Sequence, residues 1–122
     1  AHYLDPVRVQ NGADLYAQNC ASCHGAKLQG EPDWKTRDSD GFMPAPPHDA
    51  SGHTWHHPTE QLFAVTKFGT AALVGNGYKS RMSGFADVLS DDEILDILAY
   101  IKSTWPERIV KRHTEMDAAS GS

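Results

Sequence analysis

The feature that most constrains this chain is a short motif, Cys20-Ala21-Ser22-Cys23-His24. Its two cysteines are the only ones among 122 residues. Because they stand three positions apart, they cannot cross-link distant segments, and a structural disulfide framework is excluded. The chain also carries ten glycines and seven prolines, and residues 29–58 lack regular periodicity. A bound group that fills the middle of the molecule would explain how so loop-rich a chain stays compact.

The motif has the form C-x-x-C-H, which is the attachment signature of c-type haem. In such sites the two thiols add to the two vinyl groups on one edge of the porphyrin, and the next residue offers a ring nitrogen to the iron. We therefore predict one covalent haem c, attached through Cys20 and Cys23 and ligated by His24.

Two other uses of the cysteine pair compete with haem. A thioredoxin-like redox pair needs a βαβ setting, and no segment of this chain alternates with the period of two that strands require. A zinc site could combine the cysteines with two histidines of the cluster His53, His56 and His57. Haem attachment is preferred to both, and the zinc alternative stays open.

The patterning predicts an all-α chain with long loops. Asp5-Pro6 is a typical helix opening, and Ser90-Asp91-Asp92-Glu93 matches the S-x-x-E capping box at the start of a strongly amphipathic segment. Gly69 and Trp105-Pro106 are expected to end helices. The expected helices span 6–19, 58–69, 90–105 and 106–116, and the expected loops span 25–57 and 70–89.

Length and charge narrow the range of functions. The chain is the size of one domain, so we expect a single domain over 1–117 followed by a flexible tail over 118–122. A net charge of −5 argues against nucleic acid as a partner. The longest apolar run, 94–101, is too short to span a membrane, so membrane association is expected only through a partner or a missing anchor. No leader is visible, and we interpret the sequence as a soluble, mature form.

Residues 5–107 resemble the class I cytochrome c family. The shared features are the C-x-x-C-H motif after a first helix, a proline-containing loop, a methionine in a later loop and an amphipathic C-terminal helix. Residues 78–85, followed by 89–94, look like the family's axial-methionine loop running into its last helix. The resemblance implies the class I fold, in which a few helices with long loops wrap round one haem.

The resemblance also implies that Met82 is the sixth iron ligand, on the haem face opposite His24. Met82 lies 58 residues after His24 and shortly before the last predicted amphipathic helix, whereas Met43 lies only 19 residues after it. We interpret Met43 as an apolar contact on the haem or in the core. His/Met ligation favours ferrous iron and leaves no coordination site for oxygen or peroxide, which predicts electron transfer rather than oxygen chemistry.

Supporting roles follow from the same resemblance. The carbonyl of Pro46 or Pro47 is expected to accept a hydrogen bond from the His24 ring and so fix its orientation. His48, the next residue, departs from the family, which more often has an apolar residue there.

The terminal helices are expected to cross, as they do in the family. Gly12 would permit their close approach, and Tyr16 and Tyr100 would interlock beside it. This role is structural, so replacing these residues should weaken folding before it alters redox chemistry.

The stretch Gly52-His53-Thr54-Trp55-His56-His57 is the most unusual in the sequence. Its three histidines could bind a metal or supply an alternative axial ligand, and Trp55 could donate its indole N–H to a haem propionate. Tyr78 and Arg37 are further candidates for that propionate contact. The favoured interpretation is a solvated loop in which Trp55 packs on the haem edge.

These features predict a one-electron carrier rather than an enzyme, with redox proteins as partners and no small-molecule substrate. Haem attachment in the family takes place outside the cytoplasm, which implies a periplasmic or otherwise exported protein, either a free shuttle or the haem domain of a larger oxidoreductase. Lys27, Lys79 and Arg81 are candidates for steering an acidic partner. Two alternatives stay open: a haem sensor or enzyme with five-coordinate or bis-histidine iron, and a histidine-rich metal-binding module.

Overall fold

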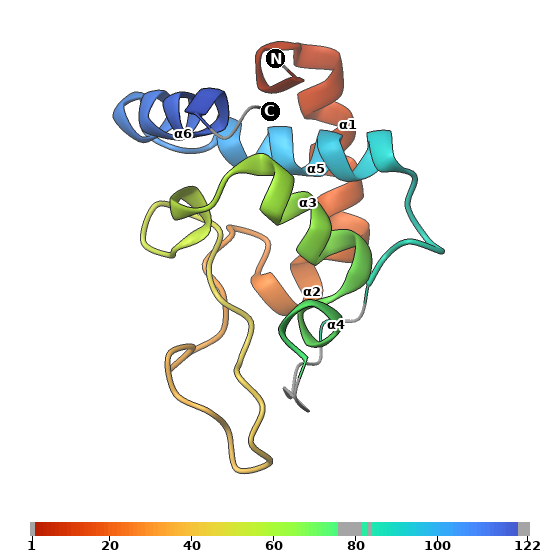
Figure 1. The fold of residues 1–122 in the computed structure, drawn as a ribbon, viewed down its shortest axis with the longest axis vertical. Coiled ribbons are helices and arrows are strands. Elements are labelled where there is room, and N and C mark those ends of the chain that lie inside the picture. Colours follow the sequence, from red (N-terminus) through yellow and green to blue (C-terminus); the bar gives the residue numbers. More distant parts are fainter. Residues whose placement is uncertain (1, 76–81, 83, 120–122) are drawn as a thin grey trace.

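The computed structural model describes residues 2–75, 82 and 84–119. Within this part of the chain every regular element is a helix, so the predicted all-α class is confirmed. In chain order the elements are η1 (His2–Leu4), α1 (Pro6–Asn19), α2 (Ala21–His24), η2 (Thr54–His56), α3 (Thr59–Phe68), α4 (Thr70–Val74), α5 (Asp91–Ser103) and α6 (Glu107–Ala119) (Figure 1).

The predicted capping residues fix the starts of α1 and α5. Asp5 Oδ1 accepts a hydrogen bond from the backbone N–H of Val7 at 3.0 Å, and Pro6 occupies the first helical position. At α5, Ser90 Oγ accepts from the Glu93 N–H at 3.1 Å, and Glu93 Oε1 accepts from the Ser90 N–H at 2.9 Å. This reciprocal pair satisfies two backbone donors that the helix itself leaves unpaired.

The expected loops contain helical turns that the patterning does not predict. Gly69, with φ at 89°, ends α3 as predicted, but α4 follows at once inside the expected loop 70–89. Similarly, α2 forms within the cysteine motif directly after Cys20. Such short helices hold too few residues for an apolar period of 3.6 to be recognised. At the other end of the chain, α6 continues past the predicted end at Met116 and includes residues 118 and 119 of the predicted tail.

The centre of the fold is the crossing of α1 and α5 (Figure 1). A Cβ at Gly12 would lie 1.9 Å from the carbonyl oxygen of Asp96, so only glycine lets the two backbones approach this closely. Beside the crossing, the rings of Tyr16 and Tyr100 lie 5.6 Å apart, which confirms the predicted packing. The buried hydrophobic cluster is formed by Tyr16, Leu28, Leu89, Ile94, Ile97, Ile101, Trp105 and Ile109.

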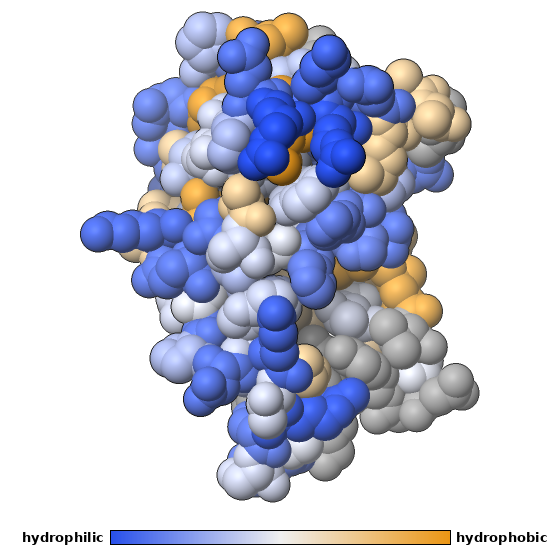
Figure 2. Space-filling model, turned by 90° about the vertical axis from the view of Figure 1, so that its left-hand side faces the viewer, coloured by the Kyte–Doolittle hydropathy of each residue, from blue (hydrophilic) through white to orange (hydrophobic). Residues whose placement is uncertain are grey.

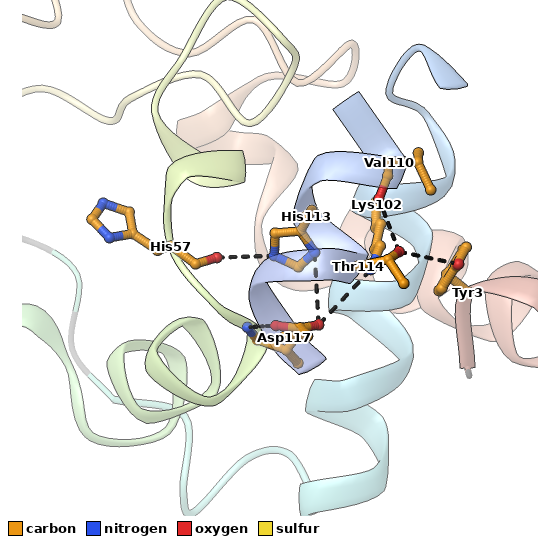
Figure 3. A network of polar contacts seen from close by, with 8 residues as sticks. Tyr3, His57, Lys102, Val110, His113, Thr114 and Asp117 are labelled. Atoms are coloured by element: carbon orange, nitrogen blue, oxygen red, sulfur yellow. Dashed lines mark hydrogen bonds and ion pairs between the residues drawn. The ribbon is translucent and has the colours of Figure 1, made fainter. Parts of the chain in front are cut away.

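A polar cluster fastens α6 to the rest of the molecule (Figure 3). The carboxylate of Asp117 accepts hydrogen bonds from the Thr59 N–H at 2.7 Å and from its hydroxyl at 2.6 Å, so it caps the start of α3. The Nε2–H group of His113 donates to the carbonyl oxygen of His57 at 2.9 Å. Lys102 on α5 lies 3.8 Å from the same Asp117 carboxylate. These contacts join α6, α5 and the start of α3.

The surface of the molecule is largely polar on the side drawn in Figure 2, where hydrophobic residues are scattered among hydrophilic ones. Between α2 and η2 the chain forms one long loop that extends away from the helices and folds back to them (Figure 1). None of the helices in the described ranges has the length and apolar character needed to cross a membrane.

Candidate functional site

The cysteine motif is held at the C-terminal end of α1. The Cys20 N–H donates to the carbonyl oxygen of Tyr16 at 2.8 Å, and α2 begins directly after Cys20. The Tyr16 hydroxyl donates to the carbonyl oxygen of Gly25 at 2.7 Å, which ties the end of α2 back to α1. The motif therefore forms one compact turn anchored to the central helix crossing.

Both thiols are available for attachment chemistry, because neither cysteine forms a disulfide. Cys23 is exposed and Cys20 is half-buried. Burial, and to a smaller extent the neighbouring Cys23, raises the pKa of Cys20 to about 11. A redox-active C-x-x-C pair needs a cysteine with a lowered pKa, so this environment argues against thiol–disulfide exchange.

The ring of His24 is buried, with 7% of the residue exposed, and its orientation is defined by one hydrogen bond. Nδ1 lies 2.8 Å from the carbonyl oxygen of Pro46. A carbonyl can only accept, so Nδ1 carries a hydrogen, and in the neutral ring Nε2 then carries the lone pair. Burial lowers the pKa of His24, and the hydrogen bond to Pro46 opposes that shift. The lowered pKa favours the neutral imidazole, which is the form that ligates a metal through Nε2.

Two glycines, Gly30 and Gly52, let the segment that contains Pro46 and Pro47 pack close to the chain around His24. Gly30 adopts φ of +74°, and a Cβ there would lie 2.5 Å from the nitrogen of Pro47. A Cβ at Gly52 would lie 2.2 Å from the carbonyl oxygen of Pro47, so this buried proline is enclosed from two sides. Of the two prolines named from the sequence, the structure gives the hydrogen bond to Pro46, while Pro47 shapes the loop that presents it.

His48 lies directly beside the His24 ring, with ring centroids 4.1 Å apart. Its Nδ1 is 2.7 Å from the Thr54 hydroxyl, and its carbonyl oxygen accepts the indole N–H of Trp105 at 2.8 Å. Burial, and then the neighbouring His24, lower the pKa of His48 to about 3. From the sequence, His48 was noted only as a departure from the family, and no role was given to Thr54 or to the Trp105 indole. A buried indole N–H needs a hydrogen-bond acceptor, and this requirement was the one signal in the sequence that could have indicated the contact of Trp105.

Met82 lies in irregular backbone and is partly buried. The chain just after it is fixed to the end of α3, because the N–H groups of Phe85 and Ala86 donate to the carbonyls of Thr66 and Lys67 at 3.0 and 3.1 Å. Three residues singled out from the sequence, Tyr78, Lys79 and Arg81, lie outside the described residues.

The Gly52–His57 region forms an aromatic cluster on the loop. Trp55 stacks on His56 with ring centroids 3.8 Å apart, and its indole N–H donates to the carbonyl oxygen of Ala50 at 3.1 Å. A propionate contact by Trp55 would have to replace that hydrogen bond. Arg37, the other described candidate for this contact, donates to the carbonyl oxygen of Gly41 at 2.8 Å.

The three histidines of this stretch are exposed, and the rings of His53 and His56 meet edge-on with centroids 5.7 Å apart. The ring of His57 points away from the polar cluster that its carbonyl joins (Figure 3). Among the residues that the structure describes, no group of three or more His, Cys, Asp or Glu side chains is arranged to hold a metal ion. Neither the zinc site with the cysteines nor a site formed by His53, His56 and His57 is therefore assembled in this part of the chain.

Comparison with known proteins decides the family. A sequence model of the cytochrome c family matches residues 9–105. This chain belongs to the cytochrome c family. The cytochrome is also similar in structure to cytochrome CL from the marine methylotrophic bacterium Methylophaga aminisulfidivorans MPT, with a TM-score of 0.58 and 23% identity over 98% of this chain and 71% of that one. The comparison with curated protein sequences gives no significant match.

Family membership and fold confirm the predicted class I c-type cytochrome. Its cofactor is covalent haem c, and the residues present fit that group: two uncrosslinked thiols in C-x-x-C-H spacing precede a buried histidine whose Nε2 is free. The cytochrome is a haem-based electron carrier and not an enzyme, as the motif and the resemblance predicted. Its partners are redox proteins, and class I cytochromes c are typically exported.

Proposed function

We propose that this cytochrome carries single electrons through a haem ligated by His24 and Met82. The observation that carries the proposal is the setting of His24, a buried imidazole whose Nδ1 lies 2.8 Å from the carbonyl oxygen of Pro46, which leaves Nε2 as the nitrogen available to a metal. Such an arrangement raises the basicity of the ligating nitrogen and fixes its direction. Met82 is supported by its partly buried position in the irregular segment ahead of α5.

The chain's own residues would hold the haem and leave its iron six-coordinate. Cys20 and Cys23 would each hold the haem through a thioether, in which the sulfur would bond to one vinyl carbon and the thiol proton to the other, so that no oxidant would be needed. The bound haem supplies a reversible one-electron couple. The thioether of Met82 is soft and neutral, so as a ligand it would favour the ferrous state and would leave no position for oxygen.

Further roles are proposed for other residues singled out from the sequence. Trp55 would pack on the haem edge, and Tyr78 would contact a propionate. Lys27, with Lys79 and Arg81, steers an acidic redox partner. The single monohaem domain spans 1–117, and the cytochrome works in the periplasm or another exported location, as a free shuttle or as the haem domain of a larger oxidoreductase.

The test is the absorption spectrum of the holoprotein in both oxidation states. Sharp reduced bands are expected from the c-type haem, and a weak far-red sulfur-to-iron band is expected in the ferric form. Met82→Ala should abolish the far-red band, while Met43→Ala should leave it in place. A band that survives in Met82→Ala would contradict the proposed ligand. Rapid binding of carbon monoxide by the reduced wild type would favour the alternative of a sensor or enzyme with an open site.

A further inference from the structure

His48 is packed against the side of the His24 ring in a way that suggests a function beyond filling space. The two ring centroids are 4.1 Å apart, and the ring planes are inclined at 39°. We propose that His48 is a positioning residue for His24, and that its ring, held by Thr54 and Trp105, fixes the rotation of the His24 imidazole. The inference rests on the proposed function, in which His24 is an iron ligand.

A single hydrogen bond leaves the orientation of the His24 ring incompletely fixed. The bond from Nδ1–H to the Pro46 carbonyl holds one edge of the ring at 2.8 Å. The terminal torsion of a histidine side chain is broad, so the ring plane can still turn while that bond is kept. A second group packed against the ring limits this turning, and His48 is in the position to do so.

His48 can limit the rotation of the His24 ring because three hydrogen-bonding contacts hold His48 itself in place. Its N–H donates to the carbonyl oxygen of Leu28 at 2.8 Å, and its own carbonyl accepts from the Trp105 indole at 2.8 Å. Its Nδ1 is 2.7 Å from the Thr54 hydroxyl, and this contact restrains the ring in addition to the two hydrogen bonds of its backbone. An aliphatic side chain at this position would also pack against His24, but no hydrogen bond would fix its rotamer.

The orientation of a ligand ring has measurable consequences. In low-spin ferric haem, the plane of the axial imidazole contributes to the anisotropy of the g-values. The groups that surround a metal ligand also tune the reduction potential. A residue that only stabilises the fold would move neither property.

Thr54→Val and Thr54→Ser in the holoprotein test the inference. Valine keeps the shape of threonine but removes the hydroxyl that holds the His48 ring, whereas serine keeps that hydroxyl. We expect Thr54→Val to change the g-values of the ferric protein and to shift its midpoint potential, and Thr54→Ser to give wild-type values. His48→Leu should change both properties further.

Ser90→Ala serves as the control for lost stability, because it removes the capping box of α5 without touching His24. Its g-values and potential should match the wild type. The inference is overturned if Thr54→Val and His48→Leu both keep wild-type spectra and potentials, or if Ser90→Ala changes them as much. A wild-type protein with no low-spin ferric signal would overturn the proposed His24/Met82 ligation and this inference with it. A low-spin wild type with unaltered variants would overturn this inference alone.

Discussion

At the scale of single residues, the site depends on a glycine just beyond the motif, because the N–H of Gly30 donates to the carbonyl oxygen of His24 at 2.6 Å. Gly30 lets the chain pass close to the prolines, since a Cβ there would lie 2.5 Å from Pro47 N and 2.8 Å from the carbonyl carbon of Pro46. The sequence predicted a proline carbonyl as the partner of His24, because the resemblance supplied that role. It left Pro46 and Pro47 both open, since the choice depends on how the loop folds back against Gly30.

Gly30→Ala should therefore displace the acceptor of the His24 hydrogen bond. We expect a loss of about 1–3 kcal/mol in the free energy of unfolding from backbone strain and contact with the prolines, together with a shift in midpoint potential. Gly75→Ala is a matched control, because Gly75 has φ of +72° but no described atom within 4 Å of its Cβ position. It should cost stability through strain alone and leave the potential unchanged. Equal shifts in potential for the two variants would contradict the role of Gly30.

At the scale of elements, local signals predicted the longer helices, and the family resemblance predicted the crossing of the terminal helices, but other contacts between distant segments were missed. Asp5, Ser90 and Gly69 act within a few residues of the helix ends that they define, so their roles can be read along the chain. The N-terminus of α3 has no side-chain cap from Pro58. It is capped by Asp117 from α6, and a pairing 58 residues apart leaves no local pattern.

The crossing of α1 and α5 gives the clearest prediction at this scale. Alanine normally favours a helix over glycine by about 0.5–1 kcal/mol. Gly12→Ala should nevertheless destabilise the protein by about 3 kcal/mol, because the new methyl group would lie 1.9 Å from the Asp96 carbonyl and force the helices apart. Chemical denaturation of the holoprotein measures this loss. Gln18→Ala, at an exposed position of the same helix, should change stability little; a stable Gly12→Ala would show that the crossing can relax.

At the scale of the whole molecule, the chemistry of the five-residue motif was predicted, whereas of the groups that surround it only the proline carbonyl was. Covalent attachment of a haem requires Cys20, Cys23 and His24 at this spacing along the chain. The motif therefore identifies these residues without knowledge of the fold. The groups that hold His24 in place come from distant positions, and Trp105 reaches His48 from just beyond the end of α5. Trp105 also packs edge-on against His113 at 5.1 Å, which connects the surroundings of the site to the polar cluster under α6.

That cluster should make the stability of the whole protein depend on pH. His113 is 1% exposed, and burial, followed by the charge of Lys102, lowers its pKa, while Asp117 and the His57 carbonyl oppose the shift only in part. An unfolded histidine titrates near pH 6.5. Above that pH, His113 is neutral in both the folded and the unfolded protein, so burial of its ring carries no penalty for losing a proton. Below it the unfolded chain takes up a proton that the folded protein does not, so stability falls as the pH is lowered.

His113→Gln should reduce this acid sensitivity, because its amide can donate to the His57 carbonyl but does not titrate. We expect the free energy of unfolding of the ferric holoprotein to fall less between pH 7 and pH 5 in His113→Gln than in the wild type, as measured by denaturant titrations at several pH values. Some dependence will remain, because His48, whose pKa burial also lowers, acts in the same direction. His53→Gln, at an exposed histidine, should keep the wild-type slope. If the two variants have the same slope, the acid sensitivity does not arise at His113, and the polar cluster under α6 has no part in it.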